Sequence, residues 1–255
     1  MSVARRSLSK ILIAFLFPLL ALQAGAEPLR VALSPDYMPL AFKQDGKLLG
    51  IEIDNAREVA SILGRQVRFV EMAQDQYIEA LNSGKVDVVM SGFSITPERR
   101  AQVAFADSFM QIGQMAIILA ERAGTLAYPR AIYQSGIKIG VEPGTTGFKF
   151  VRDNFPGAEI LTYPQPDAAF DALRKQEIDA FIHDAPTSWN LASSRENQDL
   201  LSLYRPLNRE ELAWAVQKDN KLLQQRLNAA LAELRANGRL SAIQNYWIPV
   251  TVQVR

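Results

Sequence analysis

Residues 86–100, with the sequence VDVVMSGFSITPERR, decide the fold that we expect for this chain. The segment Val86–Met90 is short, apolar and β-branched, which is typical of a parallel strand covered on both faces. Two small residues end that strand, and Thr96 followed by Pro97 predicts a helix start, because proline lacks the N–H that a first turn leaves unpaired. The guanidinium of Arg99 therefore joins hydroxyls and backbone amides at a strand's carboxyl end, where open α/β sheets bind ligands.

The planar fork of Arg99 can bond two oxygens at once, which suits a carboxylate or a phosphate. Two interpretations are open from this stretch alone. Arg99 either holds an anion, or it is solvated like its neighbour Arg100.

Strands alternate with helices on both sides of this segment. Strands are expected at 29–33, 67–70, 136–141, 160–163 and 178–182, and helices at 54–63, 76–83, 148–154, 167–175, 220–237 and 240–247. The alternation predicts βαβ units, and the pattern starts again after residue 135. We therefore predict an α/β protein with two Rossmann-like lobes, mostly parallel sheets and a ligand cleft between the lobes.

The chain has no long linker, so two short segments must cross between the lobes. The extended apolar runs Gln114–Ala120 and Leu212–Val216 are predicted to be these hinge strands. The first lobe then comprises residues 27–115 and 212–255, and the second comprises residues 116–211.

Residues 1–26 are predicted to be a cleaved signal peptide. Arg5, Arg6 and Lys10 precede an apolar run that ends in Ala24-Gly25-Ala26, which resembles a cleavage site. The chain has no cysteine, so no lipid can be attached to an N-terminal cysteine. We therefore expect a periplasmic protein without a lipid anchor.

Composition excludes several functions. Three of the 28 Lys and Arg residues and none of the 27 acidic residues lie in the signal, which leaves a net charge of −2 and no electrostatic case for nucleic acid. Thiol chemistry is absent, and the single histidine, His183, cannot form a multi-histidine metal site. We predict no metal and no cofactor. Whether His183 or Trp189 reaches a ligand stays open, although strand alternation should send His183 and Asp184 to opposite sides.

Polar residues of the second half match those around Arg99. Thr145 and Thr146 precede a helix, and Asp184 follows a buried strand, so an anion and an ammonium could each find a partner there. Together with Arg99 they fit an α-amino acid. The alternatives are that the threonines only cap the helix and that Asp184 only caps the next one.

At this point the chain resembles the bacterial extracellular solute-binding proteins, family 3, which are amino-acid receptors of ABC importers. The resemblance is carried by LRVALSPDYMPL (29–40), residues 50–56, SGKVDVVMSGFSITPER (83–99), GVEPGTTG (140–147), IDAFIHD (178–184) and residues 212–247. It implies two lobes that close on a ligand. It also implies a monomer that delivers a small carboxylate ligand to an inner-membrane ABC permease.

The resemblance also implies roles for single residues. Arg99 and Thr146 would bind the ligand carboxylate, and Asp184 the ammonium. Further contacts are expected from Ser94, the backbones of Ser91 and Gly92, the aromatic ring of Tyr37, and Ser34, Gln74 and Phe93. Relatives selective for basic side chains have an acidic residue in place of Ser34, and many have an aromatic residue in place of Gln74. Residues 50–54 also depart from the usual pattern, which we interpret as a packing change.

Two other functions remain open. Exported cyclohexadienyl (prephenate or arogenate) dehydratases resemble the same family, but we expect no acidic residue in the cleft besides Asp184 to serve as the acid. The protein could also be a ligand sensor that acts on a membrane kinase.

Overall fold

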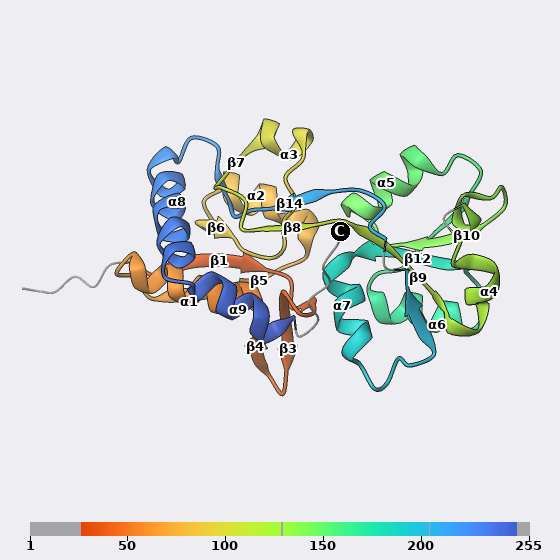
Figure 1. Cartoon of the computed structure of the whole chain (residues 1–255). Coiled ribbons are helices and arrows are strands. Elements are labelled where there is room, and N and C mark those ends of the chain that lie inside the picture. Colours follow the sequence, from red (N-terminus) through yellow and green to blue (C-terminus); the bar gives the residue numbers. More distant parts are fainter. Residues whose placement is uncertain (1–26, 129, 204, 249–255) are drawn as a thin grey trace, which may run out of the picture.

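The computed structural model describes residues 27–248, apart from 129 and 204, and shows two lobes joined in the middle (Figure 1). The first lobe contains a sheet of order β5–β1–β6–β15–β7, with bounds Val67–Glu71, Leu29–Leu33, Val88–Val89, Ala215–Gln217 and Val103–Phe105. The second lobe contains a sheet of order β11–β10–β12–β9–β13, with bounds Glu159–Thr162, Lys138–Val141, Ala180–Asp184, Gln114–Leu119 and Leu200–Ser202.

In each sheet four strands run in one direction, and a single strand, β15 or β9, runs against them. The predicted α/β fold with two lobes and mostly parallel sheets is therefore confirmed. A small hairpin sheet is formed by β2 (Asp36–Tyr37), β3 (Ala41–Gln44) and β4 (Lys47–Leu49).

Helices cover both faces of each sheet. The first lobe has α1 (Ile51–Ile62), α2 (Tyr77–Asn82), α3 (Pro97–Gln102), α8 (Lys221–Ala236), α9 (Arg239–Trp247) and the 3₁₀ turn η1 (Gln74–Gln76). The second has α4 (Ala123–Leu126), α5 (Thr146–Asn154), α6 (Pro166–Arg174), α7 (Ala185–Ser193), η2 (Ala120–Arg122) and η3 (Ala131–Tyr133).

Strand alternation divides the first lobe's core in two. Val31 packs in the cluster that includes residues of α1, α8 and α9, whereas its neighbour Ala32 packs with Tyr77 of α2.

Helix α1 begins at Ile51, earlier than the predicted residue 54. Gly50 precedes it at φ 120°, where a Cβ would lie 2.4 Å from the Leu40 carbonyl oxygen, so only glycine fits.

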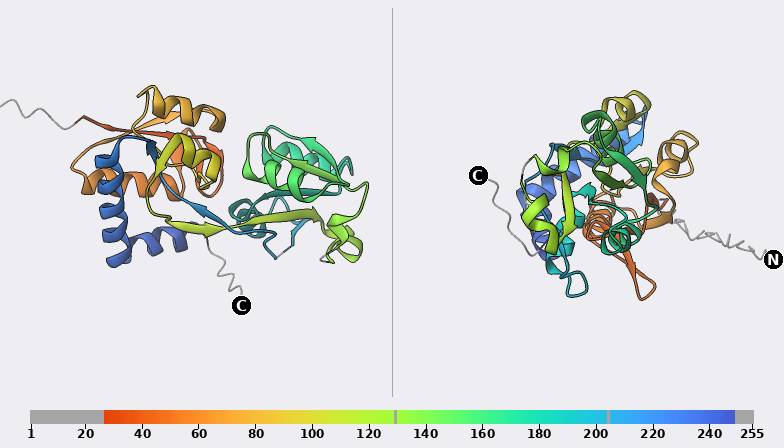
Figure 2. Two further views of the ribbon diagram at one scale, coloured as in Figure 1. Left: turned by 90° about the horizontal axis from the view of Figure 1, so that it is seen from above. Right: turned by 90° about the vertical axis from the view of Figure 1, so that its right-hand side faces the viewer.

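Two antiparallel strands, β8 (Met110–Ile112) and β14 (Glu210–Leu212), run between the lobes (Figure 2). The predicted hinge segments were placed a few residues too late along the chain. Residues 114–119 form β9, in which every residue is buried, and residues 215–217 form β15 of the first sheet. Both runs are apolar mainly because they lie inside a sheet, and only Leu212 belongs to a crossing strand. We retain the lobe boundaries near 115 and 212 as a proposal, and the predicted signal peptide lies outside the described residues.

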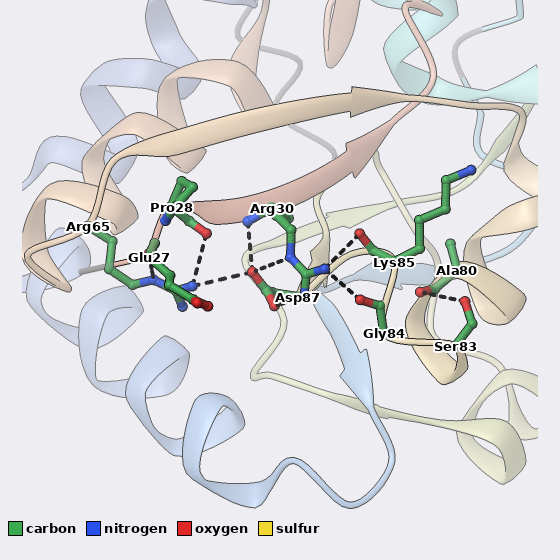
Figure 3. Close-up of polar contacts among 9 residues, drawn as sticks. All are labelled: Glu27, Pro28, Arg30, Arg65, Ala80, Ser83, Gly84, Lys85 and Asp87. Atoms are coloured by element: carbon green, nitrogen blue, oxygen red, sulfur yellow. Dashed lines mark hydrogen bonds and ion pairs between the residues drawn. The ribbon is translucent and has the colours of Figure 1, made fainter. Parts of the chain in front are cut away.

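A charged cluster joins the amino-terminal ends of β1 and β6 (Figure 3). The Asp87 carboxylate accepts from the Arg30 backbone N–H at 2.8 Å, from Arg30 Nη2 at 2.7 Å and from Arg65 Nη2 at 3.3 Å. Arg30 Nη1 also donates to the Gly84 carbonyl at 2.6 Å. Burial raises the pKa of Asp87, but the hydrogen bonds from Arg30 outweigh it, so the pKa is lowered.

Replacing Asp87 by alanine is expected to reduce the free energy of unfolding by about 2–3 kcal/mol at pH 7, since two arginines lose their acceptor. The lowered pKa makes this contribution full above the usual aspartate pKa and lost as the pH falls through the lower pKa of the folded protein, so the deficit should shrink in acid below the usual aspartate pKa. Urea unfolding measures it. Replacement of the exposed Asp219 is the control and should change stability little.

Candidate ligand-binding site

A cavity of about 600 Å³ lies between the lobes at the carboxyl ends of their parallel strands. Eight of the ten predicted ligand residues line it: Ser34, Tyr37, Gln74, Ser91, Gly92, Ser94, Thr146 and Asp184. Arg99 and Phe93 do not line the cavity, but both adjoin Ser94 on its wall. The cavity has the size of a small-molecule site.

The turn at 91–99 forms as the sequence predicts. The Thr96 hydroxyl caps α3 by accepting from the Arg99 backbone N–H at 3.2 Å. The Arg99 guanidinium donates to the Ser94 carbonyl at 2.8 Å and lies 3.9 Å from the centroid of the Phe93 ring. Burial lowers the pKa of Arg99, partly offset by Asp184 and Glu210. Among the described residues no carboxylate forms an ion pair with Arg99, so its charge can still take an anion.

The structure places Phe93 differently from the prediction. Its side chain is 2% exposed and packs in the core, stacked on Phe105 and edge-on to Tyr77. Phe93 therefore supports the Arg99 guanidinium from beneath through a cation–π contact and does not touch the cavity.

Glu52 is a buried group beneath the cavity that the sequence interpretation took for a packing change. Its carboxylate accepts from the Gly92 backbone N–H at 2.9 Å and from the Trp214 indole N–H at 3.0 Å. The loop is tight here, because a Cβ on Gly92 would lie 2.7 Å from the Tyr37 ring. Glu52 therefore fixes the loop whose backbone, at Ser91 and Gly92, was expected to contact the ligand.

Burial raises the pKa of Glu52 to about 7, against the hydrogen bonds from Gly92 and Trp214. A group whose pKa is raised by folding contributes stability that is complete below its pKa in the unfolded chain. This contribution is lost as the pH rises through its pKa in the folded protein. Wild-type protein should therefore lose roughly 3 kcal/mol of unfolding free energy between pH 4.5 and 7.5 from this group.

Glu52→Gln should lack this pH-dependent component, because glutamine does not titrate. Urea unfolding at closely spaced pH values measures the difference between the two proteins. The exposed Glu79→Gln is the matched control. A Glu52→Gln profile parallel to that of wild type would contradict the assignment.

The two threonines at the start of α5 have separate roles. Thr145 is the helix cap, with its hydroxyl accepting from the Phe148 backbone N–H at 3.1 Å. Thr146 lines the cavity and donates its hydroxyl to Glu210 Oε2 at 2.7 Å. The capping alternative is therefore correct for Thr145, and Thr146 keeps its side chain for the site.

Asp184 stands at the N-cap position of α7, but its side chain makes no capping bond. Its two oxygens instead accept from the Tyr37 hydroxyl and from the Gln114 amide. The bond to Tyr37 crosses from the second lobe to the first, so opening of the cleft must break it. Burial raises the pKa of Asp184, the charge of His183 lowers it, and that of Glu210 raises it, with a net rise.

His183 also reaches the cavity, against the expectation from strand alternation. The chain turns from β12 into α7 at Asp184, so alternation no longer separates the two neighbours. His183 Nε2 lies 3.0 Å from Glu142 Oε2, and its Nδ1 lies 2.8 Å from the Thr187 hydroxyl. Burial lowers the pKa of His183, but Glu142 and Asp184 raise it more, so the net shift is upward. Trp189 packs against the core and does not line the cavity.

Apart from His183, the charged side chains that line the cavity are all acidic within the described part of the chain. They are Asp36, Glu71, Asp75, Glu142 and Asp184. The expectation of no acidic residue besides Asp184 is therefore wrong. Glu71 is the last residue of β5 and Glu142 follows β10 directly, so the strand-end rule that found Asp184 could have found them. The site therefore contains carboxylates even though residue 34 is a serine and not an acidic residue.

Two further polar residues, Gln114 and Glu210, were not expected at the site. Gln114 Nε2 donates to Glu210 Oε1 at 2.9 Å as well as to Asp184.

Among the described residues no cluster of three or more His, Cys, Asp and Glu side chains could hold a metal ion. The same residues include no helix that is long and apolar enough to cross a membrane.

The fold and the cavity define a two-lobed binding protein, and comparison with known proteins identifies its family. The family description of bacterial extracellular solute-binding proteins, family 3, matches residues 29–250. The chain belongs to this family.

Relatives and solved structures agree with this assignment. The L-cystine-binding protein TcyJ of Escherichia coli K12 is 29% identical over 225 residues, covering 88% of this chain and 84% of that protein. The histidine-binding periplasmic protein of Salmonella typhimurium LT2 is 30% identical over 242 residues, covering 91% of each. The crystal structure of the ancestral amino acid-binding protein AncCDT-1, a precursor of cyclohexadienyl dehydratase, aligns with a TM-score of 0.80 at 30% identity, covering 87% of this chain and 95% of that one.

Proposed function

We propose that this protein captures an α-amino acid between its lobes and delivers it to an ABC permease of the inner membrane. The observation that carries the proposal is the half-buried Arg99, which has no ion-pair partner among the described residues and adjoins the cavity wall at Ser94. Thr146 and Asp184 line the same cavity from the second lobe. An α-amino acid offers the carboxylate and ammonium that these groups would bind.

In the proposed complex Arg99 and Thr146 bind the carboxylate, while Asp184 accepts from the ammonium. Ser94 and the carbonyl groups of Ser91 and Gly92 complete the ammonium site, since the Gly92 N–H is already bonded to Glu52. Lobe closure removes the ligand from water, which strengthens these charge-assisted bonds.

The acidic lining indicates which side chains the site accepts. Glu71, Asp75 and Glu142 would repel a ligand with an anionic side chain, and they can accept hydrogen bonds from a neutral or cationic one. We therefore propose that the ligand has a polar neutral or cationic side chain.

A thermal-shift screen of the purified protein tests this proposal, because ligands of the folded state raise its melting temperature. Neutral and basic amino acids are expected to raise it, and aspartate and glutamate are not. Calorimetry on the compounds that shift it then gives affinities. If no compound with a carboxylate raises the melting temperature, the proposal is wrong.

A dehydratase activity is the second candidate, favoured by one observation. His183 is bonded to Glu142 on the cavity wall, so the site contains an imidazole–carboxyl pair through which a proton could be transferred. We propose a binding role and expect no turnover. Incubation with prephenate and a search for phenylpyruvate tests this, and its formation would overturn the proposal.

The periplasmic location is part of the same proposal. Residues 1–26 lie outside the described part of the chain, so it rests on their charged and apolar pattern and on the family. Fractionation of cells that express the full chain should release the protein, shortened to begin near Glu27, with the periplasmic fraction.

A further inference from the structure

Gln114 occupies the point where the hinge meets the site. It is the first residue of β9, two residues after the crossing strand β8 ends, and it is paired with Asp184 in the sheet register. The residue is 0% exposed. Its amide Nε2 donates to Asp184 and to Glu210, with the Thr146 hydroxyl oxygen 3.3 Å away.

Glu210 brings the second crossing strand to the same point. It lies on β14, opposite Ile112 of β8. Its carboxylate accepts from Thr146 Oγ1 at 2.7 Å, from Asn208 Nδ2 at 2.9 Å and from Gln114 Nε2 at 2.9 Å. Glu210 on the crossing strand β14 is thus bonded to Thr146, and Gln114, two residues beyond the crossing strand β8, is bonded to Asp184. Thr146 and Asp184 are the two groups of the second lobe that the proposed function uses.

Close packing fixes the Gln114 amide in place. Its backbone N–H donates to Asn208 Oδ1 at 2.7 Å. A Cβ on Gly147 would lie 2.7 Å from Gln114 Oε1, and a Cβ on Gly113 would lie 2.3 Å from the Asn208 carbonyl oxygen. The side chain therefore has little room to turn, and its two amide hydrogens stay directed at two carboxylates.

We propose that Gln114 and Glu210 are positioning residues that hold Asp184 and Thr146 in the geometry that receives the ligand. The neutral amide lies between the carboxyl groups of Asp184 and Glu210 and holds both by donating to each of them. The ligand contacts neither residue. The proposal rests on the proposed function, because it concerns the orientation of the ammonium and carboxylate partners assigned there.

The test is Gln114→Glu, an isosteric change that replaces a shared donor by a third carboxylate. Calorimetry with the amino acid that wild type binds should show an affinity reduced by about tenfold or more. Gln111→Glu, on the exposed side of β8, is the matched control and should bind within about twofold of wild type. Thermal unfolding of each variant without ligand verifies that it folds.

The second arm is a double-mutant cycle with Glu210→Gln, which restores the number of carboxylates and supplies a new amide. In that background the loss caused by Gln114→Glu should be at least about threefold smaller, because residue 210 can now donate to residue 114. An equal loss in both backgrounds, or unchanged affinity in Gln114→Glu alone, would overturn the proposal. A purely structural role would predict no such rescue.

Failure of the proposed function is recognised separately, since wild type would then bind no amino acid. The positioning contact is still measured without ligand by titrating the ¹³C-labelled carboxyl of Asp184. Tyr37, His183, Gln114 and Glu210 surround this carboxyl. Its pKa should rise in Gln114→Glu and stay as in wild type in Gln111→Glu. No rise would refute the contact whatever the ligand is.

Discussion

Arg99→Ala is expected to weaken amino-acid binding by about a hundredfold or more, the largest effect of any substitution in the first lobe. The guanidinium is the only cation that the proposed complex offers to the ligand carboxylate. Burial already lowers the pKa of Arg99, so its charge is less well solvated than that of an exposed arginine until an anion arrives. Without it, the carboxylate would leave water for a closed cavity lined by acidic side chains.

Two variants make the measurement specific. Arg99→Lys keeps the charge but loses the planar fork, so its affinity should fall between those of wild type and Arg99→Ala. Arg100→Ala removes the exposed neighbouring arginine and should leave affinity unchanged. Calorimetry gives all three values. Unchanged affinity in Arg99→Ala would remove this residue from the site and require another partner for the carboxylate.

The elements that the sequence predicts well are those whose signals are local. β1 has the predicted bounds, α8 lies within one residue of the predicted range 220–237 at each end, and the Thr96 cap of α3 has the expected bond. In each case the apolar period and the capping residue lie within a few positions of one another. A single stretch of sequence therefore contains the whole physical cause.

The parts of the site that escaped prediction depend on bonds between distant residues. Glu52 reaches Gly92 across 40 positions, and Gln114 reaches Glu210 across 96. Each of these side chains is polar at a position that local periodicity assigns to the interior. What the sequence does not reveal is thus the distant hydrogen-bond partner, without which burial of the polar side chain would be too costly.

His183 and Asp184 show a different limit. The alternation rule holds along a strand, and it failed here because the strand ends at the residue in question. Strand ends are also where the ligand groups gather. Local rules are therefore least reliable at the positions that matter most for binding.

Asp184→Asn is expected to lower affinity and raise stability at once. Asparagine cannot supply the negative charge that the ligand ammonium would bind, so the dissociation constant should rise by about a hundredfold. In the ligand-free protein the same change removes a buried carboxylate whose pKa is raised by burial and by Glu210. Less charge is then buried beside Glu210, and the melting temperature should increase.

Asp179→Asn provides the opposite pattern on the same chain segment. Asp179 lies just before β12, forms an ion pair with Arg122 and accepts from the Lys138 backbone N–H at 2.9 Å, away from the cavity. Its replacement should lower the melting temperature and leave affinity unchanged. Calorimetry and thermal unfolding of both variants measure the four quantities. A lower melting temperature for ligand-free Asp184→Asn, like that expected for Asp179→Asn, would show that Asp184 stabilises the fold. It would contradict the proposal that Asp184 binds the ligand and destabilises the ligand-free protein.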